Sequence, residues 1–469
     1  MALSAPEKPD GQTVDPAGRL ASDGPAALAP SAQSQPEDPL VILIVSEHAS
    51  ARFGGEAALP LHYFRVLRRR GFDVWLISHA RTRDELTQLL PDERRILYVE
   101  DTALHRLMYC LGRRLPLELA NFTTGFVSRF AVQLSQRRLA KQLIRERGIN
   151  VVHQPMPVSP REPSMMYGLG VPVIIGPMNG GMDYPPAFRR HRQPLVRVLL
   201  SLARWSSNIL NWAVPGKRHA ALLLVANQRT LAALPPGVCP RVVELVENGV
   251  DLNLWRPVPA ASPSATAASP PTFAFVGRLV DWKAVDILLD AFHLASRKAT
   301  MRLLIIGDGD ERGSLQKRAT ELGILATTRE QAGGVFFAGW LSQQQCADEL
   351  PRADCLVLSS LRECGGAVVL EAMSLGKPVI VTSWGGPADY VDESCGVLVE
   401  PVSREALVQG FADAMVRLAS SRELRERMGR NGRSKVLREY DWEVKVDRMV
   451  QLYGQAREAC VAANARSRP

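Results

Sequence analysis

The residues most suited to chemistry lie in the segment 360–391, where Glu363 and Glu371 are separated by seven residues. Two glycines follow the first glutamate, and the run AVVLEAMS after them predicts a helix. Free N–H groups at a helix N-terminus favour anions such as phosphate, and carboxylates accept hydrogen bonds from sugar hydroxyls. We therefore expect the two glutamates and the amides around Gly366 and Ala367 to bind a molecule that carries both phosphate and sugar.

A second group of charged residues follows a predicted strand in the segment FVGRLVDWK. Arg278 comes just after the strand, and Lys283 stands five residues later. An arginine suits a forked contact with phosphate oxygens, and a lysine supplies a compact positive charge. We expect both side chains to neutralise a diphosphate leaving group.

These two segments resemble motifs of the retaining glycosyltransferases of family 4, which have the GT-B fold. The spacing of Glu363 and Glu371 is similar to the Glu-x7-Glu motif of that family, and GRLVDWK is similar to its G-R-L-x-x-x-K segment. The resemblance implies that Glu371 binds the ribose hydroxyls of a nucleotide and that Glu363 contacts the donor sugar. It implies catalytic roles for Arg278, Lys283 and Glu363. Many relatives have Phe where this chain has Gly365, so this side of the sugar pocket departs from the family pattern.

The N-terminal half contains further candidates at the ends of predicted strands. His153 lies in the run NVVHQP, and the resemblance implies that it faces the reaction centre. Glycine allows a close approach to phosphate or sugar, so the pair Gly54–Gly55 and the pair Asn179–Gly180 are expected to contact the donor. The runs HQPMPVSP and PMNGG resemble a bacterial subgroup that acts in surface-polysaccharide assembly.

The resemblance implies a hexosyl transfer from a nucleoside-diphosphate sugar to a glycan or lipid-linked acceptor, with no cofactor and no metal. Asp308 and Asp310 spell DxD, the metal motif of a different glycosyltransferase fold, but here they end a predicted strand in a glycine-rich turn. Two alternatives remain open: a non-catalytic sugar-nucleotide-binding protein and a GT-B sugar-nucleotide epimerase. The first is expected to have lost one of the four charged residues, and the second lacks the Glu-x7-Glu arrangement.

The order of predicted elements indicates an α/β protein with two Rossmann-like domains and a cleft between them. Strands and helices alternate in each half, which is typical of parallel sheets covered by helices. We predict a disordered tail over 1–38, an acceptor-side domain over 39–250, a linker over 251–271, a nucleotide-sugar-binding domain over 272–440, and a crossover helix with its tail over 441–469.

Composition narrows the partners and the compartment. The seven cysteines form no C-x-x-C pair, which favours a reducing compartment, and the cytoplasm is the expected one. The net charge of +9 favours anionic partners, but no aromatic and basic pattern of an RNA-binding or DNA-binding module is present. Several basic and apolar segments, above all Phe188–His219, predict peripheral attachment to anionic lipid on the inner face of the plasma membrane. The alternative is that their apolar residues pack into the core.

Overall fold

A computed structural model describes residues 39–52, 55–114, 123–157, 159–189, 206–257 and 269–466. The predicted tail over 1–38 lies outside the described residues, as does most of the low-complexity part of the predicted linker.

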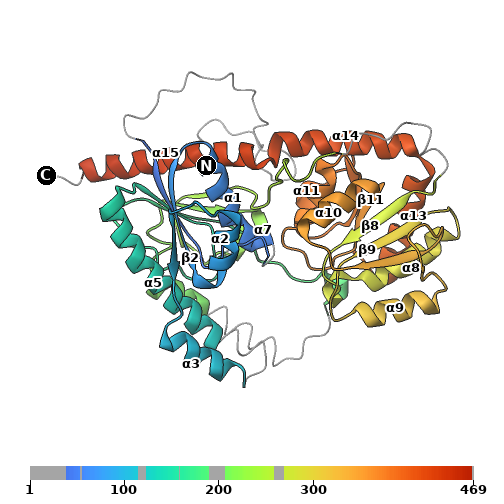
Figure 1. The fold of residues 1–469 in the computed structure, drawn as a ribbon, viewed down its shortest axis with the longest axis horizontal. Helices are drawn as coiled ribbons and strands as arrows, with labels where there is room; N and C mark the ends of the chain where they lie inside the picture. Colours follow the sequence, from blue (N-terminus) through green and yellow to red (C-terminus); the bar gives the residue numbers. More distant parts are fainter. Residues whose placement is uncertain are drawn as a thin grey trace, which may run out of the picture. The chain divides into compact units, whose positions relative to one another are not determined.

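The N-terminal half is built on a parallel sheet of seven strands (Figure 1). The strands are β1 (Val41–Val45), β2 (Asp73–His79), β3 (Ile96–Val99), β4 (Val151–Gln154), β5 (Val173–Met178), β6 (Leu222–Val225) and β7 (Val242–Glu244). The described helices of this half that bear on the argument are α1 (Gly55–Arg69), α2 (Arg83–Leu89), α3 (Ala103–Gly112), α5 (Thr124–Arg147) and α7 (Gln228–Ala233). Each strand contains a run of apolar residues, as expected for strands that are covered on both faces.

The alternation of side chains along β1 shows how this sheet builds two cores. Ile42 and Ile44 point into one hydrophobic cluster, and Leu43 and Val45 point into another on the opposite face. Successive residues of a strand face opposite sides, so one short strand contributes to both. The strand order is β3-β2-β1-β4-β5-β6-β7, so the direction of winding reverses between β1 and β4.

The C-terminal half repeats this plan with a parallel sheet of six strands. They are β8 (Thr272–Val276), β9 (Arg302–Ile306), β10 (Val335–Gly339), β11 (Cys355–Leu358), β12 (Val379–Thr382) and β13 (Gly396–Val399). Its helices are α8 (Val285–Ser296), α9 (Arg312–Glu321), α10 (Gln343–Glu349), α11 (Ala367–Ser374), α12 (Gly386–Tyr390), α13 (Arg404–Ser420) and α14 (Arg422–Glu439). The order is β10-β9-β8-β11-β12-β13, so this sheet reverses between β8 and β11.

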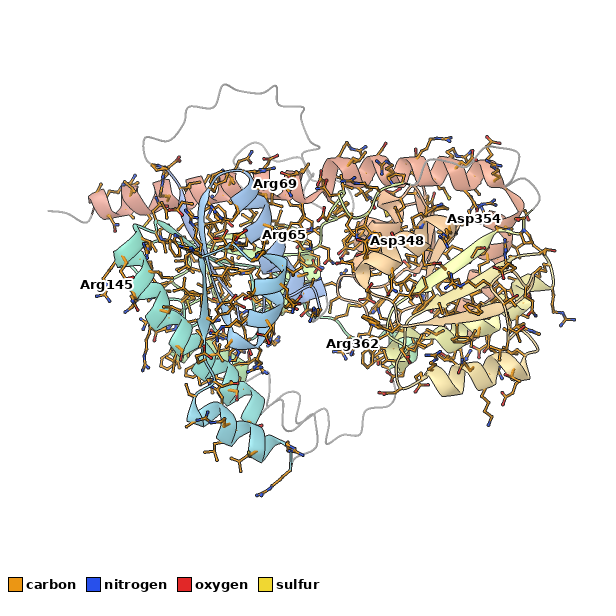
Figure 2. The ribbon with its side chains drawn as sticks, in the orientation of Figure 1. Arg65, Arg69, Arg145, Asp348, Asp354 and Arg362 are labelled. Atoms are coloured by element: carbon orange, nitrogen blue, oxygen red, sulfur yellow. The ribbon has the colours of Figure 1, made fainter. Side chains whose placement is uncertain are left out.

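The last helix, α15 (Trp442–Arg466), packs on the N-terminal sheet although it follows the C-terminal domain in sequence. Trp442, Met449 and Tyr453 belong to the same core cluster as Ile42 and Ile44. At the surface, Glu443 pairs with Arg69 and Arg70 of α1; Figure 2 labels Arg69. The crossover helix predicted from the sequence is therefore present and is held by both apolar and charged contacts.

Candidate functional site

Two expected catalytic residues meet where the C-terminal sheet reverses its winding. Lys283 follows β8, Glu363 follows β11, and their side chains form an ion pair. Only 15% of the Lys283 side chain and 16% of the Glu363 side chain are exposed. In sheets of this kind, ligands bind at the carboxyl ends of the strands at such a reversal point. The geometry therefore places this pair where a ligand is expected.

Hydrogen bonds connect the loop after β8, which carries Lys283, with the loop after β11, which carries Glu363. The Ser359 hydroxyl donates to the carbonyl oxygen of Lys283 at 2.9 Å, and the Leu361 amide donates to Trp282 at 2.8 Å. The Ser360 hydroxyl donates to the Glu363 carboxylate at 3.3 Å. These hydrogen bonds join the loop that carries Lys283 to the loop that carries Glu363.

Arg278 lies on the same loop but is arranged differently. Its side chain is exposed, and its guanidinium carbon lies 5.9 Å from the ring centre of Trp282. Within the described ranges, its guanidinium forms no ion pair or hydrogen bond. Its positive charge is thus available to an anionic ligand.

The second glutamate lies on α11, one turn into the helix. Gly366 precedes the helix in the left-handed conformation, with φ of 70°. A side chain is strained in this conformation, which explains the glycine at this position. Burial raises the pKa of the Glu371 carboxyl to about 8, and in the described part of the chain its carboxyl has no hydrogen-bond partner. A carboxyl without a protein partner is suited to accept hydroxyl groups from a ligand.

Asn179 reaches this site from the N-terminal half, but it binds protein groups. Its side-chain amide donates to the carbonyl oxygen of Cys364 at 3.0 Å and to the Glu247 carboxylate. Glu247 is buried, and burial raises its pKa. Asn179 therefore holds the backbone that follows Glu363, a positioning contact that differs from the predicted direct contact with the donor.

The departure from the family pattern at Gly365 has a steric reason. A Cβ atom at this position would lie 2.2 Å from Nδ2 of Asn248 and 2.5 Å from Oε1 of Glu247. Both distances are far below van der Waals contact, so no larger residue fits while these two side chains remain in place. The sequence reasoning missed Glu247 and Asn248; the glycine at 365 was the signal that a neighbouring group fills the space.

The predicted glycine contacts have mixed outcomes. Gly54 lies outside the described residues, and Gly55 begins α1. The next residue, Glu56, has a raised pKa because of partial desolvation and the nearby charge of Glu363, although much of its side chain is exposed. Gly180 instead packs against Pro160, and its amide donates to Thr230 at 3.0 Å.

The structure places His153 in the core, which corrects the expectation that it faces a reaction centre. Its side chain is fully buried, and both ring nitrogens have partners: the Gly176 carbonyl oxygen and the Tyr453 hydroxyl, each at 2.7 Å. Burial lowers the pKa of His153 to about 4, so the ring is neutral. Val152 faces the other side of the sheet, so its neighbour His153 faces the crossover helix α15. His153 therefore links β4 to this helix.

The Asp308 carboxylate of the DxD sequence is bound by other protein groups. It accepts hydrogen bonds from the Gly309 amide and from Arg312, both at 2.8 Å. Among the described residues, no group of three or more histidines, cysteines or carboxylates is arranged to hold a metal ion.

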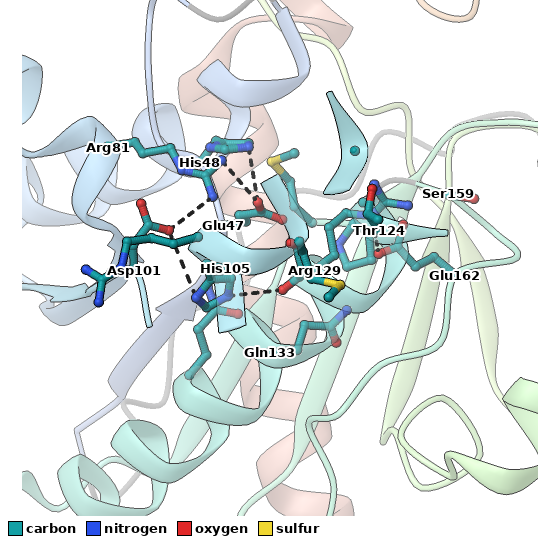
Figure 3. Close-up of a pocket in the computed structure, with 18 of the residues that line it drawn as sticks. Glu47, His48, Arg81, Asp101, His105, Thr124, Arg129, Gln133, Ser159 and Glu162 are labelled. Carbon is teal, nitrogen blue, oxygen red and sulfur yellow. Dashed lines mark hydrogen bonds and ion pairs between the residues drawn. The ribbon is translucent and has the colours of Figure 1, made fainter. Parts of the chain in front are cut away.

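A large pocket lies at the reversal point of the N-terminal sheet, between the ends of β1 and β4 (Figure 3). Its volume is about 1210 Å³. On one side, Arg81 lies 3.9 Å from Glu47 and 3.7 Å from Asp101; on the other, Arg129 pairs with Glu162 at 3.2 Å. The sequence reasoning missed these residues, although Glu47, Arg81 and Asp101 each follow closely after a predicted strand.

The basic segment expected to meet a membrane is described only in part. Lys217 is buried and donates to the carbonyl oxygen of Pro160 at 2.7 Å, and burial lowers its pKa to about 7. It is therefore a core contact, which corrects its assignment to a basic surface. Trp212 is 71% exposed, and most arginines of the segment lie outside the described residues. Among the helices that the structure describes, none has both the length and the apolar character to cross a bilayer.

A family model matches the C-terminal half of the chain. Residues 261–435 match the model described as "Glycosyl transferases group 1". This match contains the ion pair, α11 and both glutamates of the motif. The C-terminal half of the chain is therefore similar to the group 1 glycosyl transferases.

Curated relatives of the chain include two bacterial glycosyltransferases. One is the lipopolysaccharide core biosynthesis glycosyltransferase LpsE of Rhizobium meliloti, 32% identical over 188 residues, which are 40% of this chain and 51% of LpsE. Another is the D-inositol 3-phosphate glycosyltransferase of Segniliparus rotundus, 32% identical over 224 residues, which are 46% of this chain and 48% of that protein. The chain thus spans about half the length of these relatives.

Solved structures establish the fold of both halves. HepE of Anabaena, in complex with UDP, matches with a TM-score of 0.59 and 17% identity, over 89% of this chain and all of HepE. Sucrose-phosphate synthase of Thermosynechococcus elongatus matches with a TM-score of 0.59 and 20% identity, over 90% of this chain and all of the synthase. The predicted GT-B architecture is confirmed.

Proposed function

We propose that this chain is a retaining, metal-independent hexosyltransferase. It moves a sugar from a nucleoside diphosphate to a glycan or lipid-linked acceptor in bacterial polysaccharide or envelope biosynthesis. The observation that carries the proposal is the ion pair of Lys283 and Glu363 at the reversal point of the C-terminal sheet, with the N-terminus of α11 beside it. The structure of HepE with UDP supports a uridine nucleotide as one candidate donor class.

Each group has a defined part in the proposed reaction. Lys283 and Arg278 neutralise the diphosphate as it leaves, and the first amides of α11 donate hydrogen bonds to its oxygens. Glu363 accepts hydroxyls of the donor sugar, and Glu371 accepts ribose hydroxyls. The bond from the anomeric carbon to the diphosphate breaks as the acceptor oxygen bonds on the same face, and the leaving phosphate takes the acceptor proton. The configuration of the anomeric carbon is thereby retained.

A ligand screen followed by a transfer assay tests this proposal. Thermal denaturation is measured with UDP-, GDP- and ADP-sugars, because a ligand that binds only the folded state raises the melting temperature. The stabilising donor is then assayed for release of its nucleoside diphosphate, with and without EDTA. We expect one donor class to stabilise the protein and turnover to continue in EDTA. Loss of turnover in EDTA with recovery in Mn²⁺ would overturn metal independence, and binding of a donor without turnover on any acceptor would favour a sugar-nucleotide-binding protein.

A further inference from the structure

A short segment of the N-terminal half, residues 182–189, packs on the C-terminal half, and we call it the docking arm. It follows β5 and contains a short 3₁₀ turn at Pro186–Phe188. Tyr184 and Phe188 of the arm are half-buried against the hydrophobic core of the C-terminal half. Apolar contacts of this kind stabilise the packing, so the arm joins the two halves.

The docking arm also forms a hydrogen bond with the loop after β12. The indole Nε1 of Trp384 donates to the carbonyl oxygen of Asp183 at 2.8 Å, although the two residues are 201 positions apart in the chain. The Trp384 side chain is half-buried, and an indole N–H in such a place usually has a hydrogen-bond partner. Trp384 therefore fixes its own loop to the arm.

The loop that carries Trp384 packs directly on the backbone of Glu363. The Gly386 amide donates to the carbonyl oxygen of Glu363 at 2.9 Å. A Cβ atom at Gly385 would lie 2.3 Å from the same oxygen, and a Cβ atom at Gly386 would lie 2.1 Å from the carbonyl oxygen of Cys364. Both distances are far below van der Waals contact, so only glycine permits this approach. A displacement of the loop therefore displaces the backbone of Glu363.

We propose that Trp384 is a positioning residue through which the docking arm of the N-terminal half holds Glu363 in place. The loop of Trp384 contacts the backbone of Glu363, and the arm in turn contacts Trp384. This inference rests on the proposed function in one respect, because the proposed function assigns Glu363 to the donor sugar. It gives a role to the run MDYPPAF, which follows the glycines that were expected to contact the donor.

Hydrogen exchange of the chain without donor tests the positioning by itself. Trp384→Phe keeps an aromatic ring and removes the Nε1 donor. The backbone amides of residues 361–367 should exchange roughly two- to tenfold faster in this variant, the factor that one neutral hydrogen bond contributes. Trp212→Phe changes a tryptophan of the N-terminal half that is 71% exposed, and it should exchange like the native chain. Native exchange rates at 361–367 in Trp384→Phe would overturn the positioning role.

Calorimetry with the donor chosen by thermal denaturation tests the consequence for binding. Trp384→Phe should bind the nucleoside-diphosphate sugar roughly two- to tenfold more weakly, because the donor must then order the loop without this hydrogen bond. It should bind the nucleoside diphosphate alone like the native chain, since Glu363 contacts only the sugar in the proposed site. Equal losses for the two ligands would overturn the inference, because they would show a change in the whole site.

A double-mutant cycle tests whether Trp384 acts through Glu363. In a Glu363→Ala background, Trp384→Phe should cause no further loss of affinity for the nucleoside-diphosphate sugar, because the group that it positions is absent. A further loss of the same size as in the native background would assign Trp384 to another group and overturn the inference.

The docking arm is tested by Phe188→Ala, which removes part of its packing. This variant should also weaken binding of the nucleoside-diphosphate sugar. Its combination with Trp384→Phe should lose less than the product of the two separate factors, because both changes release the same arm. Phe336→Ala removes a half-buried phenylalanine of β10 that packs on the same core, and it should bind like the native chain. Factors that simply multiply would overturn the role of the arm.

The two measurements keep this inference separate from the proposed function. If the native chain binds no nucleoside-diphosphate sugar, the proposed function fails. Faster exchange at 361–367 in Trp384→Phe would still support the positioning of Glu363 by the arm.

Discussion

The two sheets reverse their winding in the same way, but the two reversal points differ in what they offer a ligand. At the C-terminal point, Lys283 and Glu363 form a mostly buried ion pair on loops fixed by hydrogen bonds. At the N-terminal point, a pocket of about 1210 Å³ is lined by Arg106 of α3 and by Arg113 just after that helix, and neither guanidinium has an ion pair or hydrogen bond among the described residues. The comparison teaches that one fold supplies two kinds of site: a preorganised charged pair, where we propose that the donor binds, and a roomy pocket lined by charged side chains.

The largest expected effect comes from removing the cation of the C-terminal point. Lys283→Ala should lower the transfer rate by roughly 10²–10³, because the loss of one group that stabilises developing charge costs about this much. The rate is measured with the donor found by thermal denaturation. Lys298→Ala removes a lysine of the same domain that pairs with Asp413 at the surface, and it should transfer normally. A Lys283→Ala enzyme with the native rate would remove the assigned role.

The next effect concerns the pKa of Glu371. The folded protein holds a proton on this carboxyl up to about pH 8, whereas the unfolded chain releases it near the ordinary value of 4.5. The resulting stabilisation is therefore fully present below pH 4.5 and is lost as the pH rises through 8. Ribose hydroxyls donate to the ionised carboxylate, so nucleoside diphosphate binding at neutral pH should release a proton.

Calorimetry in buffers of different ionisation enthalpy measures that proton. Glu371→Gln should abolish the release and weaken nucleoside diphosphate binding by about tenfold, the factor of one hydrogen bond to a charged group. Glu458→Gln, at an exposed position of α15, serves as the control. Proton release that persists in Glu371→Gln would assign the coupled group elsewhere.

A smaller effect on transfer is expected from the contact that joins the two halves. Asn179→Ala removes a donor to the carbonyl oxygen of Cys364 and leaves the buried Glu247 with one amide partner fewer. Leaving a buried group unsatisfied costs about 1–3 kcal/mol, so the free energy of unfolding should fall by that amount. The KM for the donor should rise, because the loop after Glu363 is less fixed. Asn431→Ala also removes a side-chain donor to a backbone carbonyl oxygen, and it should leave the KM unchanged.

The smallest effect on transfer should come from His153. His153→Ala leaves a cavity and removes two hydrogen bonds in the core, so chemical denaturation should show a loss of about 2–5 kcal/mol. The transfer rate per folded molecule should not change. His293→Ala, on α8 of the other domain, controls for loss of an imidazole. A large loss of rate without loss of stability would restore His153 as a catalytic group.

The sequence predicted the elements around the C-terminal ion pair well because their signals are local. The order of strand, loop, glycines and helix is contiguous from Cys355 to Ser374, and the apolar runs predicted every strand of both sheets except β7. The role of His153 was mispredicted because burial depends on α15, which lies 300 residues away along the chain. The contacts of Asn179 with Cys364 and of Gly365 with Asn248 likewise depend on the packing of the two halves, which no local pattern encodes.

The N-terminal pocket was not predicted as a site for a related reason. Glu47, Arg81 and Asp101 follow three different strands and come together only because parallel strands end at one edge of the sheet. Lys217 was taken for a surface cation because it stands among leucines and arginines, yet backbone carbonyl groups bind it in the interior. The composition of a segment predicts its partners only when its exposure is known.

The most direct test of the account is the affinity for one nucleoside diphosphate in variants of the two reversal points. Calorimetry is carried out on the native chain, on Lys283→Gln, on Glu371→Gln and on the double variant R106Q, R113Q. The account predicts that the first two variants bind more weakly and that the double variant binds like the native chain, because the donor occupies the C-terminal point alone. Normal binding by Lys283→Gln and Glu371→Gln, together with weak binding by R106Q, R113Q, would contradict it by placing the nucleotide in the N-terminal pocket.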